Sequence, residues 1–184
     1  MKKRNIIGAC VMVAAILAAV PLGAHTSLTR LREDAQGSYY YDNTGYAIYE
    51  GLDQRQATAN NLITVARRYT SVNSNLTGLI DDLDYAVRLT NGSYDDDAQE
   101  AQANQMMGEA AQALYEELKK TDLSEEDQKY PDQLIAEMES EQDKLNRSSY
   151  NEDAREFNQK LKSFPVNLLL PLTGVQPLAT YDYE

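Results

Sequence analysis

An uncharged run of 19 residues, from position 6 to position 24, constrains this 184-residue chain more than any other feature. As an α-helix the run would rise about 28 Å, close to the roughly 30 Å hydrocarbon thickness of a bilayer. Basic residues occupy positions 2 to 4, and no acidic residue occurs before Glu33. We therefore expect residues 1–5 to form a basic segment and residues 6–24 to form a single-pass transmembrane signal anchor.

The same run also fits a cleaved signal peptide, because a basic start followed by an apolar stretch is typical of both. Cleavage after Ala24 would place Leu22 at the third position before the cut, where a small residue is preferred. We therefore expect the segment to remain as an anchor. The positive-inside rule then places the N-terminus in the cytoplasm and the rest of the chain outside the cytoplasmic membrane.

The remainder of the chain is strongly acidic. Residues 25–184 carry 14 basic and 29 acidic side chains, so their net charge is −15. Nucleic-acid binding requires clustered positive charge, and this balance argues against it. The only His is His25 and the only Cys is Cys10, which excludes His-based triads, multi-His metal sites and intrachain disulfides. Without a nucleophile–base set or a phosphate-binding loop, we expect no enzymatic activity, no cofactor and no metal.

Apolar residues recur at seven-residue intervals in the first half of the acidic body. Two such series, three positions apart, form a stripe like that of a helix in a coiled-coil seam. The stripe predicts one long helix that ends at Asn91-Gly-Ser93. Asp95 to Asp97 then place negative charge on the first turn of the next helix. The expected bundle core comprises Leu62, Val65, Tyr69, Val72, Leu76, Leu79 and Leu83.

The pattern in the second half of the acidic body also predicts helices. Pro131 suits the first position of a last helix, and Pro165 ends it, because a proline disfavours helical geometry in the residue before it. The apolar pattern shifts its phase between Leu145 and Tyr150. The sequence therefore predicts an all-α protein, in which the transmembrane helix leads into a long antiparallel three- or four-helix bundle over residues 25–165.

The final segment, residues 166–184, is rich in leucine, but Pro171 and Pro177 prevent it from continuing the last helix. Left in water, it would form a large apolar patch. Folding back on the bundle, dipping into the membrane and contacting a partner are all open. Because an even number of antiparallel helices returns to the starting end, we expect the tail to pack across the membrane-proximal end of the bundle, with Phe164 as the hinge contact.

The last predicted helix carries a spaced set of aromatic and amide residues. An Arg precedes a Tyr-Asn pair, a Phe-Asn pair follows one heptad later, and a Phe-Pro pair closes the series. These positions are Arg147, Tyr150, Asn151, Phe157, Asn158, Phe164 and Pro165. The pattern resembles the C-terminal signature of the LemA family. Residues 49–69 are similar to the first bundle helix of that family, so the resemblance spans roughly residues 28–184 together with the anchor.

The resemblance implies a bacterial membrane protein with one N-terminal span and an antiparallel helical bundle, and it implies no established activity. We therefore expect a non-enzymatic, membrane-anchored bundle that acts as an extracytoplasmic scaffold or protein-interaction module. The alternative is an extracytoplasmic ligand-sensing or lipid-binding bundle. A cavity among Tyr and Asn side chains would favour that alternative, and a solid core would favour the scaffold. The amides of Asn151 and Asn158 are expected to join helices or to meet a partner.

Overall fold

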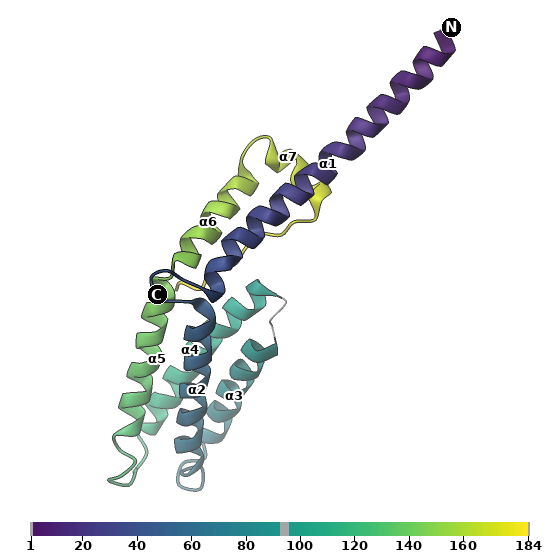
Figure 1. The fold of residues 1–184 in the computed structure, drawn as a ribbon. Helices are drawn as coiled ribbons and strands as arrows, with labels where there is room; N and C mark the ends of the chain where they lie inside the picture. The colour runs from purple at the N-terminus through teal and green to yellow at the C-terminus, as the bar shows by residue number, and fades with distance from the viewer. Residues whose placement is uncertain (1, 93–95, 184) are drawn as a thin grey trace.

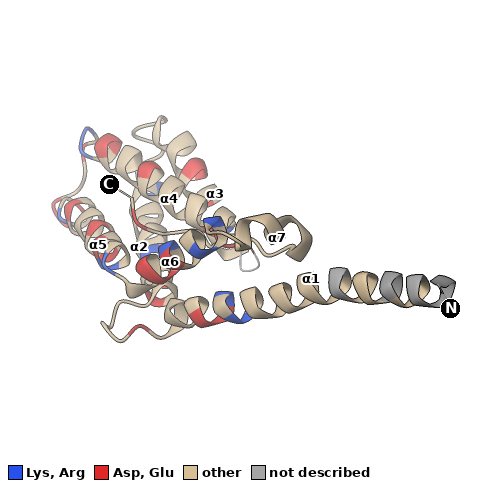
Figure 2. Cartoon of the chain, turned by 90° about the horizontal axis from the view of Figure 1, so that it is seen from above, with Lys and Arg blue, Asp and Glu red and all other residues tan. Residues whose placement is uncertain are grey.

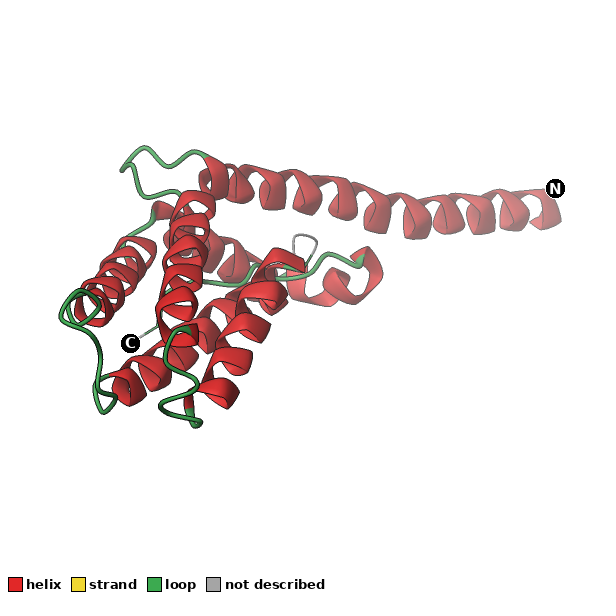
Figure 3. Ribbon diagram, turned by 90° about the horizontal axis from the view of Figure 1, so that it is seen from below, coloured by secondary structure: helices red, strands yellow, loops and turns green. Residues whose placement is uncertain are grey.

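The computed structural model describes residues 2–92 and 96–183, which form seven helices and no strand (Figure 1, Figure 3). The predicted all-α class is therefore confirmed. Ser93 and Asp95, which we placed at helix ends, lie outside the described residues, as do Met1 and Glu184.

The first helix, α1 (Lys2–Tyr40), contains the uncharged run and projects away from the body at its N-terminal end (Figure 1). Its part from Met12 to Tyr40 is long and apolar enough to cross a membrane, a criterion that N-terminal signal sequences also meet. The helix continues through position 25 without a break, and Leu28 is already buried against the body. One continuous helix thus joins the candidate span to the folded domain.

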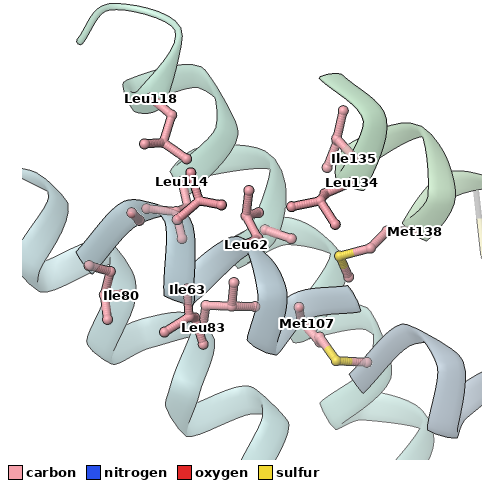
Figure 4. Close-up of a cluster of buried hydrophobic side chains, with 14 of the residues drawn as sticks. Leu62, Ile63, Ile80, Leu83, Met107, Leu114, Leu118, Leu134, Ile135 and Met138 are labelled. Atoms are coloured by element: carbon pink, nitrogen blue, oxygen red, sulfur yellow. The ribbon is translucent and has the colours of Figure 1, made fainter. Parts of the chain in front are cut away.

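Four helices form the bundle: α2 (Ile48–Arg67), α3 (Leu76–Gly92), α4 (Asp97–Leu118) and α5 (Tyr130–Asn146). Aliphatic side chains from all four meet in one apolar cluster, which we call the distal core because it lies far from the N-terminus (Figure 1, Figure 4). Its central members include Leu62, Ile63, Ile80, Leu83, Met107, Leu114, Leu118, Leu134, Ile135 and Met138.

The prediction of one continuous helix from the heptad stripe is wrong, because residues 68–75 form a turn between α2 and α3. Asn73 stabilises the turn: its side-chain oxygen accepts from the Asn75 backbone N–H at 3.1 Å, and its amide donates to Glu117 of α4 at 2.9 Å. Val72, which we expected in the core, lies in this turn and is 66% exposed.

The other six expected core residues lie on the inner faces of α2 and α3 or at their ends. Leu62, Val65, Leu76 and Leu83 are buried, whereas Tyr69 and Leu79 are half-buried at the edge of the distal core.

The last predicted helix is also divided, into α5 and α6 (Ser149–Lys162). The helix is interrupted at Ser148. The Ser148 hydroxyl accepts from the Tyr150 backbone N–H and so caps the N-terminus of α6. Asp42, in the loop after α1, accepts from the Ser148 hydroxyl at 2.9 Å and from the Ser149 N–H at 2.7 Å. The phase shift in the sequence therefore marks a helix boundary.

A second apolar cluster, which we call the proximal core, lies between α1, α6 and the C-terminal residues. It collects side chains from both halves of the chain, and α6 packs along α1 within it (Figure 1). Its buried members are Leu28, Ile48, Leu52, Leu145, Tyr150, Ala154, Phe157, Leu161, Val175, Leu178 and Tyr181.

The leucine-rich segment begins with a short helix, α7 (Val166–Thr173), that includes Pro171. Residues 174–183, the C-terminal tail, then run without regular secondary structure back along the body. The tail buries apolar side chains in the proximal core, but Phe164 is 80% exposed in the turn between α6 and α7. Phe164 is therefore not the hinge contact that we expected.

Candidate functional site

Three polar side chains interrupt the apolar faces of α2, α4 and α5 between the two cores. Arg55 lies between Leu52 and Ala59 along α2, yet it is only 2% exposed. Asn104 of α4 and Gln142 of α5 are buried as well. We call Arg55, Asn104 and Gln142 the polar layer. It separates the distal core from the proximal core.

Arg55 is a buried cation without a carboxylate partner among the residues that the structure describes. Its guanidinium donates to the Met138 carbonyl at 2.9 Å and to the Tyr183 hydroxyl at 2.7 Å, while its Nε has no hydrogen-bond partner. Burial lowers the pKa of Arg55, and the neighbouring Tyr183 opposes this shift. Because a buried charge is costly unless it is hydrogen-bonded, these acceptors hold the guanidinium in place.

The two amides of the sequence motif bind the C-terminal tail. Asn158 pairs with the backbone of Leu178, donating to its carbonyl at 2.7 Å and accepting from its N–H at 2.9 Å. Asn151 accepts from the Tyr181 N–H at 2.8 Å and donates to the Leu145 carbonyl at 2.7 Å. Asn151 therefore joins α6 to α5 as well as to the tail, and intramolecular partners occupy both amides.

Two further side chains hold the end of the tail. Asn146 pairs with the Tyr183 backbone, donating to its carbonyl at 3.1 Å and accepting from its N–H at 3.2 Å. Gln142 donates to the Tyr181 carbonyl at 2.8 Å and accepts from the Asn104 amide at 3.0 Å. The polar layer and the tail thus form one hydrogen-bonded network, in which the Asn104 side-chain oxygen has no partner.

Glu100, near the start of α4, is a buried acid at the edge of the proximal core. It accepts from the Tyr39 hydroxyl at 2.8 Å and from the Tyr181 hydroxyl. The rings of Tyr39, Tyr150 and Tyr181 pack edge to face, with centroids 5.7 to 5.9 Å apart. Burial raises the pKa of Glu100, and the two hydroxyl donors oppose that shift.

The polar layer opens at the surface into a groove of about 830 Å³ between α4 and α5. Arg55 and Tyr183 lie at its base beside Gly108. A Cβ atom on Gly108 would lie 2.5 Å from the Tyr183 hydroxyl oxygen, so the glycine allows this close approach. Four exposed carboxylates line the rim of this α4–α5 groove: Glu109, Glu116, Glu139 and Asp143.

The remaining motif residues have different environments. Tyr150 and Phe157 are buried in the proximal core, whereas Pro165 is exposed. Arg147 is also exposed, and its guanidinium carbon lies 5.5 Å from the centroid of the Tyr46 ring. Four of the seven motif residues therefore build the proximal core or bind the tail, namely Tyr150, Asn151, Phe157 and Asn158. No group of His, Cys, Asp and Glu residues suited to a metal ion occurs within residues 2–92 and 96–183.

The predicted bundle core did not include the polar layer, although the sequence contains a signal for it. Arg55 lies seven residues before Leu62, and Asn104 lies seven residues before Ala111, so both occupy positions of an apolar stripe. A polar residue at such a position predicts a buried hydrogen-bonding group. The role of Tyr183 had no comparable signal, because the extended tail has no periodic pattern.

The comparisons with known proteins identify the family of the chain. The family model of the LemA family matches residues 46–184. No curated protein and no solved structure matches. The matched region runs from just before α2 to the C-terminus and so includes the bundle, the polar layer and the tail. Because this model covers most of the sequence, the chain belongs to the LemA family.

Proposed function

We propose that this chain is a non-enzymatic, membrane-anchored helical bundle whose α4–α5 groove receives a cationic segment of a partner protein. The observation that carries the proposal is the rim of four carboxylates above a partly apolar groove. None of these carboxylates forms an ion pair with a described residue. They remain available for lysine or arginine side chains of a partner.

The size and lining of the α4–α5 groove support a segment rather than a whole domain as the occupant. Its volume, about 830 Å³, lies within the range of pockets that hold small ligands or a few side chains. Ala113, Ile135 and Met138 supply apolar surface for such side chains. The acidic rim would give specificity and fast association with a basic segment more than raw affinity.

We further propose that residues 6–24 anchor the chain in the bacterial cytoplasmic membrane, with the N-terminus inside and the bundle outside. The apolar stretch of α1 and the basic residues at positions 2 to 4 support this orientation. Protease added to intact protoplasts should then degrade the bundle, while the membrane fraction retains the N-terminal peptide. A mature protein that begins near His25 in the medium would contradict the anchor.

The groove proposal can be tested with the full chain in nanodiscs of uncharged lipid and a fluorescent peptide of Lys and Ala, with protein-free nanodiscs measured alongside to subtract binding to the lipid. A groove variant replaces the four rim carboxylates, and a matched control removes the same charge elsewhere. The groove variant combines Glu109→Gln, Glu116→Gln, Glu139→Gln and Asp143→Asn. The control combines Asp81→Asn, Asp82→Asn, Glu125→Gln and Glu126→Gln, all at exposed positions.

We expect the groove variant to bind the peptide at least about tenfold more weakly, which corresponds to about 1.4 kcal/mol, and the control to change less than about twofold. An equal loss in both variants would show that total charge, rather than the groove, attracts the peptide. A peptide in which Glu replaces Lys should not bind either variant or the parent chain.

One observation favours ligand sensing as a second candidate function. The Arg55 Nε and the Asn104 side-chain oxygen are buried and lack hydrogen-bond partners. A small ligand with one acceptor and one donor would satisfy both atoms if Tyr183 moved aside. Native mass spectrometry of the full chain released from membranes should then detect a bound small molecule, which Arg55→Met removes. Identical masses after subtraction of the substitution would count against this candidate.

A further inference from the structure

One face of α7 and of the turn before it is apolar and exposed. Phe164 is 80% exposed, Leu168 is 66% exposed and Leu172 is 65% exposed, and the spacing of four residues places the two leucines on the same helical face. Pro171 is exposed beside them. We call these four residues the α7 stripe. Soluble surfaces seldom carry such a contiguous apolar set without a use.

The position of α7 indicates what covers the stripe. This helix packs against α1 and α6, at the end of the body from which α1 projects (Figure 1). His25 donates from its Nδ1 to the Thr173 carbonyl at 2.8 Å, which fixes the end of α7 against α1. His25 directly follows the uncharged run of residues 6–24. The α7 stripe therefore lies where the candidate span would leave the hydrocarbon.

The charge distribution around α7 differs from that of the rest of the chain. Residues 163–181 contain no charged side chain, although the whole chain has a net charge of −12. Figure 2 shows α7 and the adjacent part of α1 without acidic or basic residues. The last turn of α6, next to the stripe, carries Lys160 and Lys162, both exposed. An apolar face with flanking lysines is typical of helices that lie in a membrane interface.

We propose that α7 is a second membrane contact, which inserts its stripe into the interfacial region of the bilayer that α1 crosses. Lys160 and Lys162 then face the lipid phosphates. This inference rests on the proposed anchoring of α1. It gives a function to Leu168 and Leu172, which stay exposed in the folded chain. Two contacts with one bilayer would fix the tilt of α1 and of the bundle, which a single membrane-spanning helix would leave free to vary.

The test places an environment-sensitive fluorophore on the stripe of the full chain, reconstituted in phosphatidylcholine–phosphatidylglycerol vesicles. Cys10→Ser removes the only cysteine, and Leu168→Cys then provides a single labelling position. Val72→Cys is a matched control, because Val72 is also an apolar residue with 66% exposure and lies in the turn between α2 and α3. Phe164→Cys supplies a second position on the stripe in case one label disturbs α7.

We expect the label at Leu168 or Phe164 to emit at shorter wavelength in vesicles and to lose about half of its intensity to nitroxide-labelled lipids, since an interfacial helix buries its apolar face roughly 5–10 Å deep. The label at Val72 should show neither effect. The result does not depend on the direction in which the chain inserts into the vesicle, because α7 lies on the same side of the membrane as the bundle in either direction.

Flotation of the same vesicles reports the anchoring separately. If the chain floats with the vesicles but the stripe labels behave like the Val72 label, α7 is not a membrane contact, although the anchor holds. A shift to shorter wavelength without lipid quenching would show that protein covers the stripe, which also overturns the inference. A chain that does not float would contradict the anchor and this inference together.

Discussion

The distal and proximal cores share helices but are assembled in different ways. The distal core uses aliphatic side chains from four consecutive helices, within residues 59–138. The proximal core brings together Leu28 near one end of the chain and Tyr181 near the other. In the proximal core, amide side chains of α6 bind the backbone of the C-terminal tail. The distal core depends on apolar packing. The bundle is therefore self-contained, and the proximal core is a joint that attaches α1 and the C-terminal tail to it.

The polar layer marks the boundary between these two kinds of packing. Apolar burial stabilises the distal core through many interchangeable contacts, each worth a modest amount. The proximal core also buries apolar side chains, but it depends in addition on a few amide side chains that bind the backbone of the tail, and a buried polar group left unpaired is costly. The two cores should therefore respond differently to the same kinds of substitution.

The largest expected effect comes from charging the distal core. Leu76→Asp removes a fully buried side chain at the start of α3 and buries a charge, so we expect a loss of about 3–5 kcal/mol in the free energy of unfolding. Asp82→Ala, on the exposed face of α3, should change that free energy by about 0.5 kcal/mol or less. Urea unfolding followed by circular dichroism measures both, and similar midpoints would contradict the assignment of Leu76 to the core.

An intermediate effect is expected when an amide that holds the tail is removed. Asn151→Ala leaves the Tyr181 N–H without its partner and removes one of the donors to the Leu145 carbonyl, which still accepts from the Ser148 N–H, so the loss should be about 1–3 kcal/mol. Asn158→Ala should cost less, because Asn158 is only half-buried. Hydrogen exchange should become faster in the tail and stay slow in the distal core. Unchanged exchange at Tyr181 in the Asn151 variant would show that the amide does not hold the tail.

Replacing either of two helical glycines by alanine should change the stability by a smaller amount, and in opposite directions. Gly78→Ala in α3 meets no atom within 4 Å, so the better helix propensity of alanine should stabilise the chain by about 0.5–1 kcal/mol. Gly108→Ala would instead push against the Tyr183 hydroxyl, and we expect a net loss of about 1 kcal/mol. Tyr183→Phe should itself destabilise the chain, because Arg55 loses an acceptor, but Gly108→Ala should cost less in that variant than in the parent chain, which thermal unfolding of the four chains measures. A gain for Gly108→Ala alone would rule out the close approach.

The smallest expected effect is a pH dependence confined to the proximal core. Because burial raises the folded-state pKa of Glu100, its contribution to stability is full below the unfolded-state pKa and is lost as the pH rises through the folded-state pKa. The stability of the parent chain relative to Glu100→Gln should therefore decrease from acidic to neutral pH. Urea midpoints at several pH values measure this difference. A difference that grows with pH would have the wrong sign.

The sequence predicted the distal core better than the proximal core for a physical reason. Leu62 and Leu83 repeat at heptad spacing because they pack on helices, so their burial follows from periodicity alone. The same spacing joined α2 and α3 into one predicted helix, since Tyr69 and Leu76 are also seven residues apart across the turn. The residues between them include Ser and Asn, which favour turns, but no Gly or Pro.

The proximal core was less predictable because its contacts connect distant parts of the chain. The spacing of Asn151 and Asn158 identified important amides, yet their partners lie in a tail that has no repeat. Ser148 offered a recognisable cap signal at the point where the apolar pattern changes phase. The exposure of Phe164 depends on how α7 turns against α1, which no local pattern encodes.

Hydrogen exchange of the full chain with and without residues 175–184 tests the two-core account most directly. We expect the truncated chain to lose protection in α6 and in residues 28–40 of α1, while α2, α3 and the distal half of α4 keep theirs. This outcome would show that the tail stabilises the proximal core and not the distal core. Uniform loss of protection across both cores, or no change in either, would contradict the account.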